Sequence, residues 1–249
     1  MSGHSKWATI KRKKGATDAA RGKAFSKLVK EITIAARHGG GELDSNPRLR
    51  TAVNAAKAVN MPASNIERAI KRGSGEIEGA TYEEAHYEGY APGGVALLVE
   101  VATDNKNRTA GDIRHILTKF GGNMGEAGSV SYLFKPRGVI LIEKGAIAED
   151  ALIELALEAG ADDVSAEGES FEVLTPPGAL EAVKDVLAKQ NIPVTSAEQT
   201  KLATLQVPVT GKEAEAVLRL MDALEDHDDV QKVYANFSVP DEVMAKLVR

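Results

Sequence analysis

The chain of 249 residues contains no cysteine, which excludes disulfide bonds, thiolate nucleophiles and zinc sites with cysteine ligands. It also lacks long apolar runs. The longest, at residues 95–99 and 139–142, are far shorter than the roughly 20 residues of a transmembrane helix. Cations near the N-terminus are not followed by the apolar segment of a secretory signal. We therefore expect a cytoplasmic protein with no membrane partner.

Patterns typical of catalytic and metal sites are equally scarce. The histidines do not have the spacing of metal ligands; they are His4, His38, His86, His115 and His227. No nucleophile elbow or Ser/His/Asp order is present. Aromatic residues make up only 4% of the chain and do not form the signature of an RNA-recognition motif. The sequence predicts a protein that is not an enzyme, with no catalytic residues, no cofactor, no metal and no small-molecule substrate.

Charge is present in quantity, and it is unevenly distributed. Residues 1–75 hold 16 Lys and Arg against 5 Asp and Glu, a net charge of +11. Residues 76–249 hold 15 against 31, a net charge of -16, and the two parts together give the overall -5. Such asymmetry is typical of a chain in which one end binds a polyanion and the acidic remainder does not.

The basic N-terminal part is the strongest functional signal. Residues 1–30 contain nine Lys or Arg and a single acid, with the only tryptophan, Trp7, among them. Cations neutralise phosphates, and an aromatic ring can stack on an unpaired base. The alternative is a solvated tail whose Trp7 merely docks on the helical domain. Because the following helices carry the same sign, we favour nucleic-acid binding, with these residues as ligands: Lys6, Trp7, Lys11, Arg12, Lys13, Lys14, Arg21, Lys23, Lys27, Arg48, Arg50, Lys57, Arg68, Lys71 and Arg72.

Sequence-specific readout is not indicated by the same residues. A helix-turn-helix needs a recognition helix after a tight turn, and the helices joined around Asn60-Met61-Pro62 match that pattern only loosely. We therefore expect contacts to the phosphate backbone and leave base contacts open.

Helical periodicity begins near residue 17 and continues to residue 73. A helix starts near Thr17, with Phe25, Leu28 and Ile32 on one face, and ends at the glycines 39–41. A second helix begins at Asn46-Pro47, a good cap followed by a good first-turn residue. Ser64 and Glu67 have the spacing of a capping box for a third helix, which stops at Gly73.

After a glycine-rich linker at 73–79, strand and helix patterns alternate. We expect strands at 82–90, 95–103 and 129–134, a helix at 108–120, a βαββαβ unit within 139–200, and then a strand at 203–209, a helix at 213–224 and a strand at 230–237. The fold class is α+β multidomain, an N-terminal three-helix domain followed by two ferredoxin-like domains, one inserted in the other. The predicted domains are 1–75, the discontinuous 80–135 with 202–249, and the inserted 136–201.

Several polar clusters have a structural explanation that we favour over a chemical one. The glycines at 121–125 suit tight turns, because a phosphate cradle would follow a strand and open a helix. Asn107 could cap the helix after it, while a ligand-facing role for Arg108 and Arg114 lacks support. The acidic run 225–229 is interpreted as a polar connection. A metal-dependent nuclease using Asp104 or Asp112 is a weaker hypothesis, because no motif positions a carboxylate pair.

Eight motifs, in order along nearly the whole chain, resemble the pattern of the YebC/PmpR family. They are Gly3-His4-Ser5-Lys6-Trp7, Arg21-Gly22-Lys23 with Phe25 and Lys27-Leu28, Gly39-Gly40-Gly41, Asn46-Pro47-Arg48-Leu49-Arg50, Tyr87-Glu88-Gly89-Tyr90 with Pro92-Gly93-Gly94, Asp104-Asn105 with Asn107-Arg108-Thr109, Gly128-Ser129-Val130, and Leu224-Glu225-Asp226 with Asp228-Asp229-Val230-Gln231. His227 stands where that family often has a cysteine.

The resemblance implies a helical N-terminal domain, two α+β domains, a cytoplasmic location and no enzymatic activity. It also implies one of two roles: a DNA-binding transcriptional regulator, or a ribosome-associated translation factor that binds ribosomal RNA and relieves stalling at sequences such as proline runs. Both roles share the element that the charge pattern predicts, a basic N-terminal part that binds a polyanion.

Overall fold

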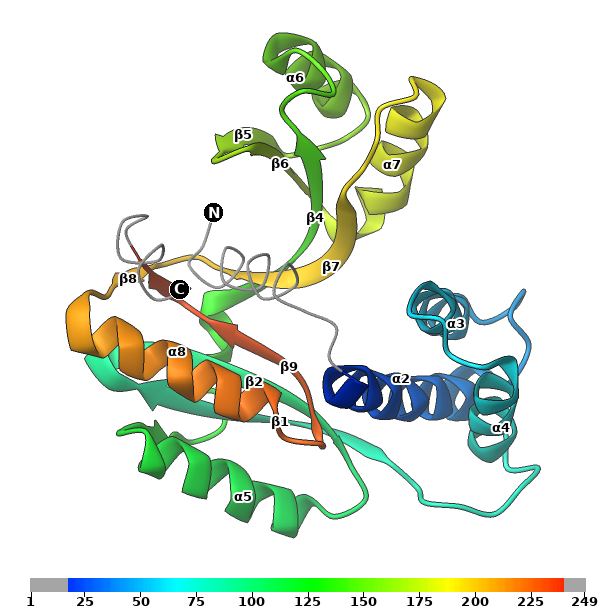
Figure 1. Ribbon diagram of the computed structural model, residues 1–249, viewed down its shortest axis with the longest axis vertical. Coiled ribbons are helices and arrows are strands. Elements are labelled where there is room, and N and C mark those ends of the chain that lie inside the picture. The colour runs from blue at the N-terminus through cyan, green and yellow to red at the C-terminus, as the bar shows by residue number, and fades with distance from the viewer. Residues whose placement is uncertain (1–17, 240–249) are drawn as a thin grey trace.

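The computed structural model describes residues 18–239 and confirms the expected α+β multidomain fold class. A group of helices lies at one end, a sheet covered by two helices lies beside it, and a second sheet with its own helices rises from the first (Figure 1). Six predicted nucleic-acid ligands lie outside the described residues: Lys6, Trp7, Lys11, Arg12, Lys13 and Lys14. Within residues 18–239, no helix is both long enough and apolar enough to cross a bilayer.

The described part of the chain opens with the helices α2 (Asp18–Gly39), α3 (Pro47–Ala58) and α4 (Ala63–Gly73). They enclose one apolar cluster, to which Ile32 of α2, Leu49 of α3 and Ile66 of α4 each contribute a buried side chain. The periodicity of apolar residues along the three segments therefore predicts their packing correctly.

Asn46 joins the end of α2 to the start of α3, as the sequence predicts. Its Oδ1 accepts a hydrogen bond from the Leu49 amide at 3.0 Å, while its Nδ2 donates to the carbonyl oxygens of Ala35 and Gly40, both at 2.8 Å. A Cβ on Gly39 would lie 2.6 Å from this Nδ2, so only glycine fits there.

The capping box predicted for α4 is wrong. The helix begins at Ala63, its N-cap is Pro62, and no side chain caps it. Ser64 lies inside the first turn because Pro62, with φ -56 and ψ 136, already turns the chain into the helix. The predicted cap at Asn107 is wrong for a similar reason. Asn105 caps the helix and accepts from the Arg108 amide.

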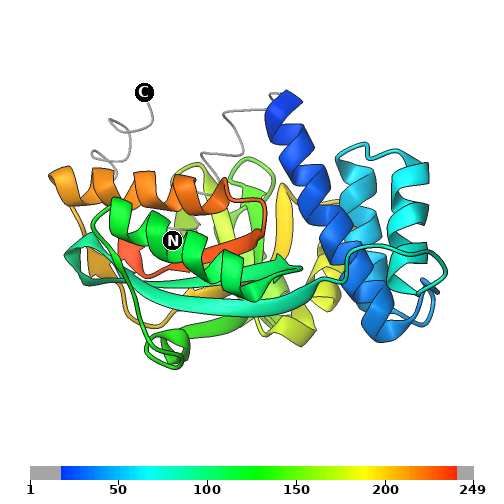
Figure 2. The same cartoon turned by 90° about the horizontal axis from the view of Figure 1, so that it is seen from below.

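The outer sheet has the strand order β3-β1-β2-β9 and is antiparallel throughout. Its strands are β1 (Glu83–Ala91), β2 (Val95–Thr103), β3 (Asn123–Met124) and β9 (Val230–Ala235). The helices α5 (Lys106–Lys119) and α8 (Gly211–Glu225) lie side by side on one face of it (Figure 2). A short parallel pair, β8 (Val207–Pro208) with β10 (Phe237–Ser238), lies beyond its end.

Alternate side chains of β2 are buried on opposite faces of the outer sheet. Val95, Leu97 and Val99 pack into the cluster formed with α5 and α8, whereas Ala96 and Leu98 pack against Phe134 and Tyr234 on the other face. Because both faces are covered, β2 reads as a nearly continuous apolar run rather than an alternating one.

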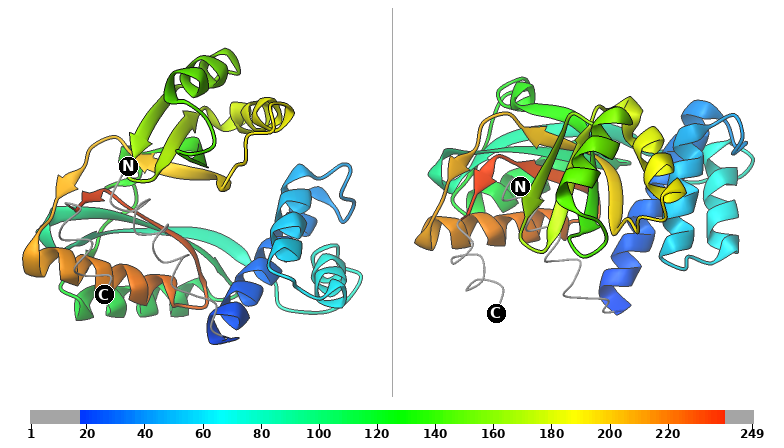
Figure 3. Two further views of the ribbon diagram at one scale, coloured as in Figure 1. Left: turned by 45° about the horizontal axis from the view of Figure 1, so that its top comes forward. Right: turned by 90° about the horizontal axis from the view of Figure 1, so that it is seen from above.

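The inserted sheet has the order β5-β6-β4-β7, which is the order of a ferredoxin-like βαββαβ unit. Its elements are β4 (Phe134–Glu143), α6 (Glu149–Glu158), β5 (Asp163–Glu167), β6 (Ser170–Thr175), α7 (Leu180–Lys189) and β7 (Ser196–Ala203). Viewed from two further directions in Figure 3, this unit stands over the outer sheet. The strand orders of the two sheets differ, so their likeness is one of α+β composition.

The strand predicted at 129–134 does not form. Residues Ser131–Leu133 make a 3-10 turn, and the buried Glu88 carboxylate accepts hydrogen bonds from the amides of Gly128, Val130 and Ser131 at 2.6–2.8 Å. A side chain therefore satisfies the amides that a neighbouring strand would otherwise bind. Burial alone would raise the pKa of Glu88, but these amide hydrogen bonds outweigh it and lower the pKa below its ordinary value.

The last strand of the βαββαβ unit predicted within 139–200 and the strand predicted at 203–209 are shifted. The strand β7 extends to Ala203 because Ala203 still pairs with Phe134 of β4, and only Val207–Pro208 remain as a separate short strand. Two-residue β3 was not predicted, because so short a strand has no periodicity to detect. Our division into three domains stays a prediction, and β4 and β7 each cross one of its boundaries by two residues.

Candidate nucleic-acid interface

Three lysines of α2 contact one turn of the outer sheet with its helices α5 and α8, which together we call the outer unit. Lys23, Lys27 and Lys30 recur at spacings of four and three residues, which places them on one face of the helix. Opposite them lies the segment Glu225–Asp229, which runs from the last residue of α8 to the residue before β9 and which we call the acidic turn. Lys23 Nζ lies 3.2 Å from Asp226 Oδ1, and Lys27 Nζ donates to the Glu225 carbonyl oxygen at 2.8 Å.

The third lysine forms the buried centre of this contact. Lys30 Nζ donates to Asp229 Oδ1 at 2.6 Å and to the Asp228 carbonyl oxygen at 2.8 Å. The side chains of Lys30 and Asp229 are only 11% and 7% exposed, so this ion pair is shielded from solvent. Asp229 Oδ2 also accepts from three donors of the outer unit, Thr103 Oγ1, Arg108 Nη2 and Thr109 Oγ1.

This network determines the charge state of Asp229. Burial alone would raise its pKa, but the hydrogen bonds from Lys30, Arg108 and Thr109 outweigh burial and hold the pKa far below its ordinary value. Asp229 is therefore an anion at neutral pH, matched by a buried lysine. A carboxylate with this many donors inside the fold stabilises the contact between α2 and the outer sheet.

Arg48 makes a second contact between the helices and the outer sheet. Its guanidinium donates to Glu31 of α2 at 2.8 and 3.1 Å and to Glu84 of β1 at 2.6 and 3.0 Å. The hydrogen bonds with Glu84 and, to a smaller extent, with Glu31 raise the pKa of Arg48 above its ordinary value. The hydrogen bond from Arg48 in turn lowers the pKa of Glu84 below its ordinary value. Arg48 thus holds two carboxylates in forked geometry.

Four further cations on α3 and α4 have a different environment. We call Arg50, Lys57, Arg68 and Lys71 the α3–α4 cations. All are exposed, and within residues 18–239 none lies within ion-pair distance of a carboxylate. Arg50 and Lys57 share one face of α3, and Arg68 and Lys71 share one face of α4. These side chains keep their donors available to a ligand in solvent.

The last two predicted ligands on described residues are Arg21 and Arg72. Arg21 is exposed near the start of α2. Arg72 is half-buried beside the linker: its stem lies against Gly79, and its Nε is buried without a hydrogen-bond partner. It lines a hollow of about 510 Å³ with Arg37 and Tyr82. The predicted cations are therefore divided among buried, paired and exposed positions rather than gathered on one surface.

The carboxylates considered for metal chemistry have protein partners. Asp104 accepts from Arg108 at 2.8 Å, and Asp112 lies 3.4 Å from His227 Nε2. Both aspartates line a hollow of about 940 Å³ between α2 and the outer unit. Across residues 18–239, no group of three or more His, Asp or Glu side chains is arranged to hold a metal ion.

Sequence reasoning missed Asp229, which has more polar partners than any other residue in this contact. The acidic run 225–229 was interpreted as a polar connection, although it is the partner of the α2 lysines. The complementary signal was present: lysines at regular spacing on one helix and a dense acidic run elsewhere. The two lie 199 positions apart in the case of Lys30 and Asp229, however, and nothing local indicates that they meet.

Comparison with sequence families identifies both parts of the chain. Residues 5–76 match the family described as "TACO1/YebC protein N-terminal domain", and residues 82–237 match "TACO1/YebC second and third domain". The boundary between the two matches falls in the linker that separates α4 from β1.

Curated relatives and a crystal structure extend this likeness. The chain is 58% identical over 248 residues to a "Probable transcriptional regulatory protein" of Dictyoglomus turgidum, covering 99% of this chain and 100% of that one. It is equally similar to a protein of the same description from Geobacter sulfurreducens, with 100% of each covered. The crystal structure of a conserved hypothetical protein from Aquifex aeolicus matches with a TM-score of 0.80 and 49% identity, covering 91% of this chain and 94% of that one.

Proposed function

Because the chain belongs to the TACO1/YebC family, we propose that it is a non-enzymatic regulator of gene expression that binds nucleic acid through its helical N-terminal part. The observation that carries the proposal is the set of α3–α4 cations, exposed and unpaired within the described residues while the acids of the chain lie mainly beyond residue 75. Such cations suit phosphates, whose neutralisation releases condensed counterions.

We assign the regulated step to transcription, with DNA as the ligand. The support is the name shared by relatives at 55–58% identity over essentially their whole length, which calls them probable transcriptional regulatory proteins. The protein would then act in the cytoplasm. The acidic units, such as 136–201 with 13 Asp and Glu against 5 Lys and Arg, would limit indiscriminate adhesion to nucleic acid.

The first test is the salt dependence of binding to a labelled DNA duplex. Replacing all four α3–α4 cations by alanine removes up to four phosphate contacts, so the log-log salt slope becomes shallower by about 3 to 4 and affinity near 0.1 M salt falls roughly 100-fold or more. The matched control removes four exposed cations of the other two units: Arg114, Lys135, Lys189 and Lys212. A four-alanine variant with the wild-type slope contradicts the proposal.

A second test separates DNA from ribosomal RNA as the ligand. Cell extracts are fractionated on a sucrose gradient with and without mild RNase, and promoter footprinting is carried out in parallel. A promoter footprint without comigration supports transcription. Comigration with ribosomal particles that RNase abolishes replaces that assignment by the ribosome-associated role, in which the same cations bind ribosomal RNA.

A further inference from the structure

We propose that the acidic turn occupies a phosphate-binding face of α2, and that nucleic acid displaces it from Lys23 and Lys27. The proposal rests on the proposed function, because the displacing partner is a phosphate backbone. It adds a regulatory contact to that function: the helical part has a closed form, in which part of its basic surface is covered by the chain's own acids.

The acidic turn offers α2 the same kind of acceptor that a phosphate backbone offers. Each of the three lysines meets a carboxylate or carbonyl oxygen of the turn at 2.6 to 3.2 Å. A lysine ammonium binds phosphate as a compact point charge, so exchanging one oxygen acceptor for another needs no special geometry. The same face can therefore bind either partner, but not both at once.

The contact is graded from an exposed end to a buried one. Lys23 and Asp226 have side chains that are 42% and 66% exposed, whereas Lys30 and Asp229 are 11% and 7% exposed. Exposed ion pairs contribute little and exchange with solvent ions, while a buried pair with further hydrogen bonds is costly to break. Displacement would thus begin at Lys23, and the Lys30–Asp229 pair would be the last part of the contact to open.

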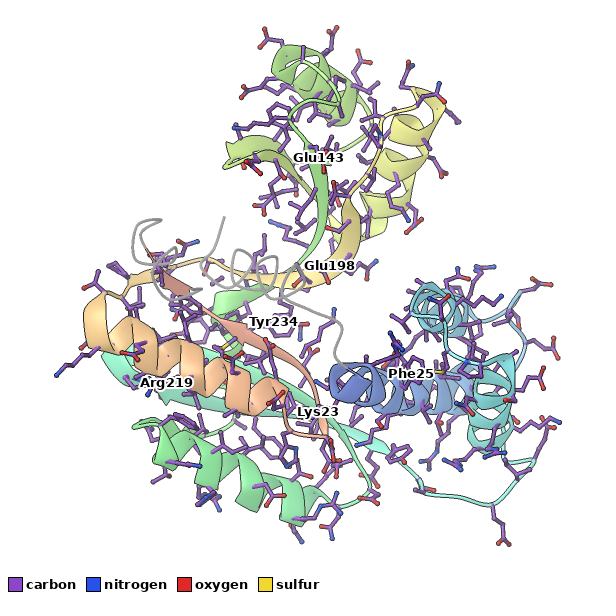
Figure 4. The ribbon with its side chains drawn as sticks, in the orientation of Figure 1. Lys23, Phe25, Glu143, Glu198, Arg219 and Tyr234 are labelled. Carbon is purple, nitrogen blue, oxygen red and sulfur yellow. The ribbon has the colours of Figure 1, made fainter. Side chains whose placement is uncertain are left out.

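Access to the exposed end is open. The hollow of about 940 Å³ reaches Lys23, Ser26 and Asp226, so a strand of nucleic acid can approach this pair before the two units separate. Figure 4 labels Lys23 where the start of α2 meets the turn between α8 and β9. The apolar clusters of the helical group and the outer unit are separate, and the hydrogen bonds of Lys27 and Lys30 connect the two sides.

The binding test compares two substitutions in the same turn. Asp226→Asn removes the partner of Lys23, and we expect it to strengthen binding of labelled single-stranded poly(dT) about 2- to 5-fold. Asp228→Asn removes the same charge two positions away, where only the backbone carbonyl contacts Lys30. Its expected gain is smaller, because no lysine is released. Equal gains from the two substitutions would mean a general effect of charge and would overturn the proposal.

A double-mutant cycle isolates the contact itself. In the Lys23→Ala variant there is no lysine for Asp226→Asn to release. Adding Asp226→Asn to that variant should therefore no longer strengthen poly(dT) binding. A gain that persists in that background overturns the displacement from Lys23. A gain that disappears supports it.

A third measurement detects opening directly and separates this proposal from the proposed function. Because the chain has no cysteine, Asn54→Cys on α3 and His115→Cys on α5 allow two dyes to be attached specifically. Saturating poly(dT) should lower energy transfer between them, and unchanged transfer overturns displacement. If neither poly(dT) nor the labelled DNA duplex binds, the proposed function fails. Linear polyphosphate then tests the contact alone: reduced transfer supports displacement and unchanged transfer overturns it.

Discussion

The α2 lysines and the α3–α4 cations belong to one helical group and carry the same charges, yet the fold treats them differently. Lys30 is almost fully buried against Asp229, and Lys23 is paired at its rim. Arg50 and Lys57 extend into solvent with no carboxylate in reach among the described residues. The first group stabilises the arrangement of the units, whereas the second remains available to a ligand.

The difference shows that counting charges does not locate an interface. A cation contributes to binding an external phosphate only as far as it is not already neutralised inside the fold. Lys30 has an internal anion, Asp229, whose removal would leave a buried charge without a partner. The α3–α4 cations have none among the described residues, so their removal should leave the fold unchanged. Mutations that separate stability from binding therefore test the comparison directly.

The largest expected effect comes from the buried end of the contact. Asp229→Asn leaves Lys30 buried without its anion, and we expect the free energy of unfolding to fall by about 3 kcal/mol. Urea denaturation followed by circular dichroism measures the change. Lys30→Met should cost less, because Asp229 retains Thr103, Arg108 and Thr109 as donors.

Asp228→Asn is the matched control for this prediction. Its side chain is exposed, so the expected change in the free energy of unfolding is within about 0.5 kcal/mol. Equal losses for Asp228→Asn and Asp229→Asn would show that the turn acts through its overall charge rather than through the buried pair.

The pH dependence of stability provides a smaller effect with a defined sign. The pKa of Asp229 is lowered in the folded chain, so its contribution is complete above the ordinary value of 3.8 and is lost as pH falls further towards the folded value. The gap in urea midpoint between wild type and Asp229→Asn should therefore be constant near neutral pH and narrow below about pH 4. A gap that widens on acidification contradicts the ionised state of Asp229.

Much of the fold could be predicted from local signals. The glycines and the Asn46-Pro47 pair mark the ends of α2 and the start of α3 because caps and left-handed positions depend on nearby residues. The prediction of a strand at 129–134 was wrong because the group that satisfies the amides of this segment is Glu88, some forty positions earlier. Local patterns fail where a distant side chain replaces a local hydrogen bond.

The candidate site was less predictable for the same reason. The sequence identifies Lys23, Lys27 and Arg50 as cations of one basic segment, but not that Lys23 and Lys27 contact a turn about two hundred positions later. Helix periodicity places the lysines on one face, and only the tertiary arrangement shows what covers that face. The remaining predicted ligands among residues 6–14 lie outside the described residues.

The smallest expected effects come from two arginines on the same helix, Arg48 and Arg50. Arg48→Ala removes partly exposed ion pairs with Glu31 and Glu84 and should lower the free energy of unfolding by up to about 1 kcal/mol. Arg50→Ala should leave stability unchanged within about 0.5 kcal/mol. For affinity to duplex or single-stranded DNA, Arg50→Ala should have the larger effect of the two substitutions. It should weaken affinity about 5-fold near 0.1 M salt, because it removes one available phosphate contact.

Urea denaturation measures the stability of the two variants, and fluorescence anisotropy measures their affinity for DNA. Arg48 is already held by two carboxylates, so it has less charge to offer a phosphate than Arg50 has. An affinity loss for Arg48→Ala that matches the loss for Arg50→Ala, without any loss of stability, would show that internal pairing does not decide which cations bind. The distinction between the two basic groups would then fail at its most closely matched pair.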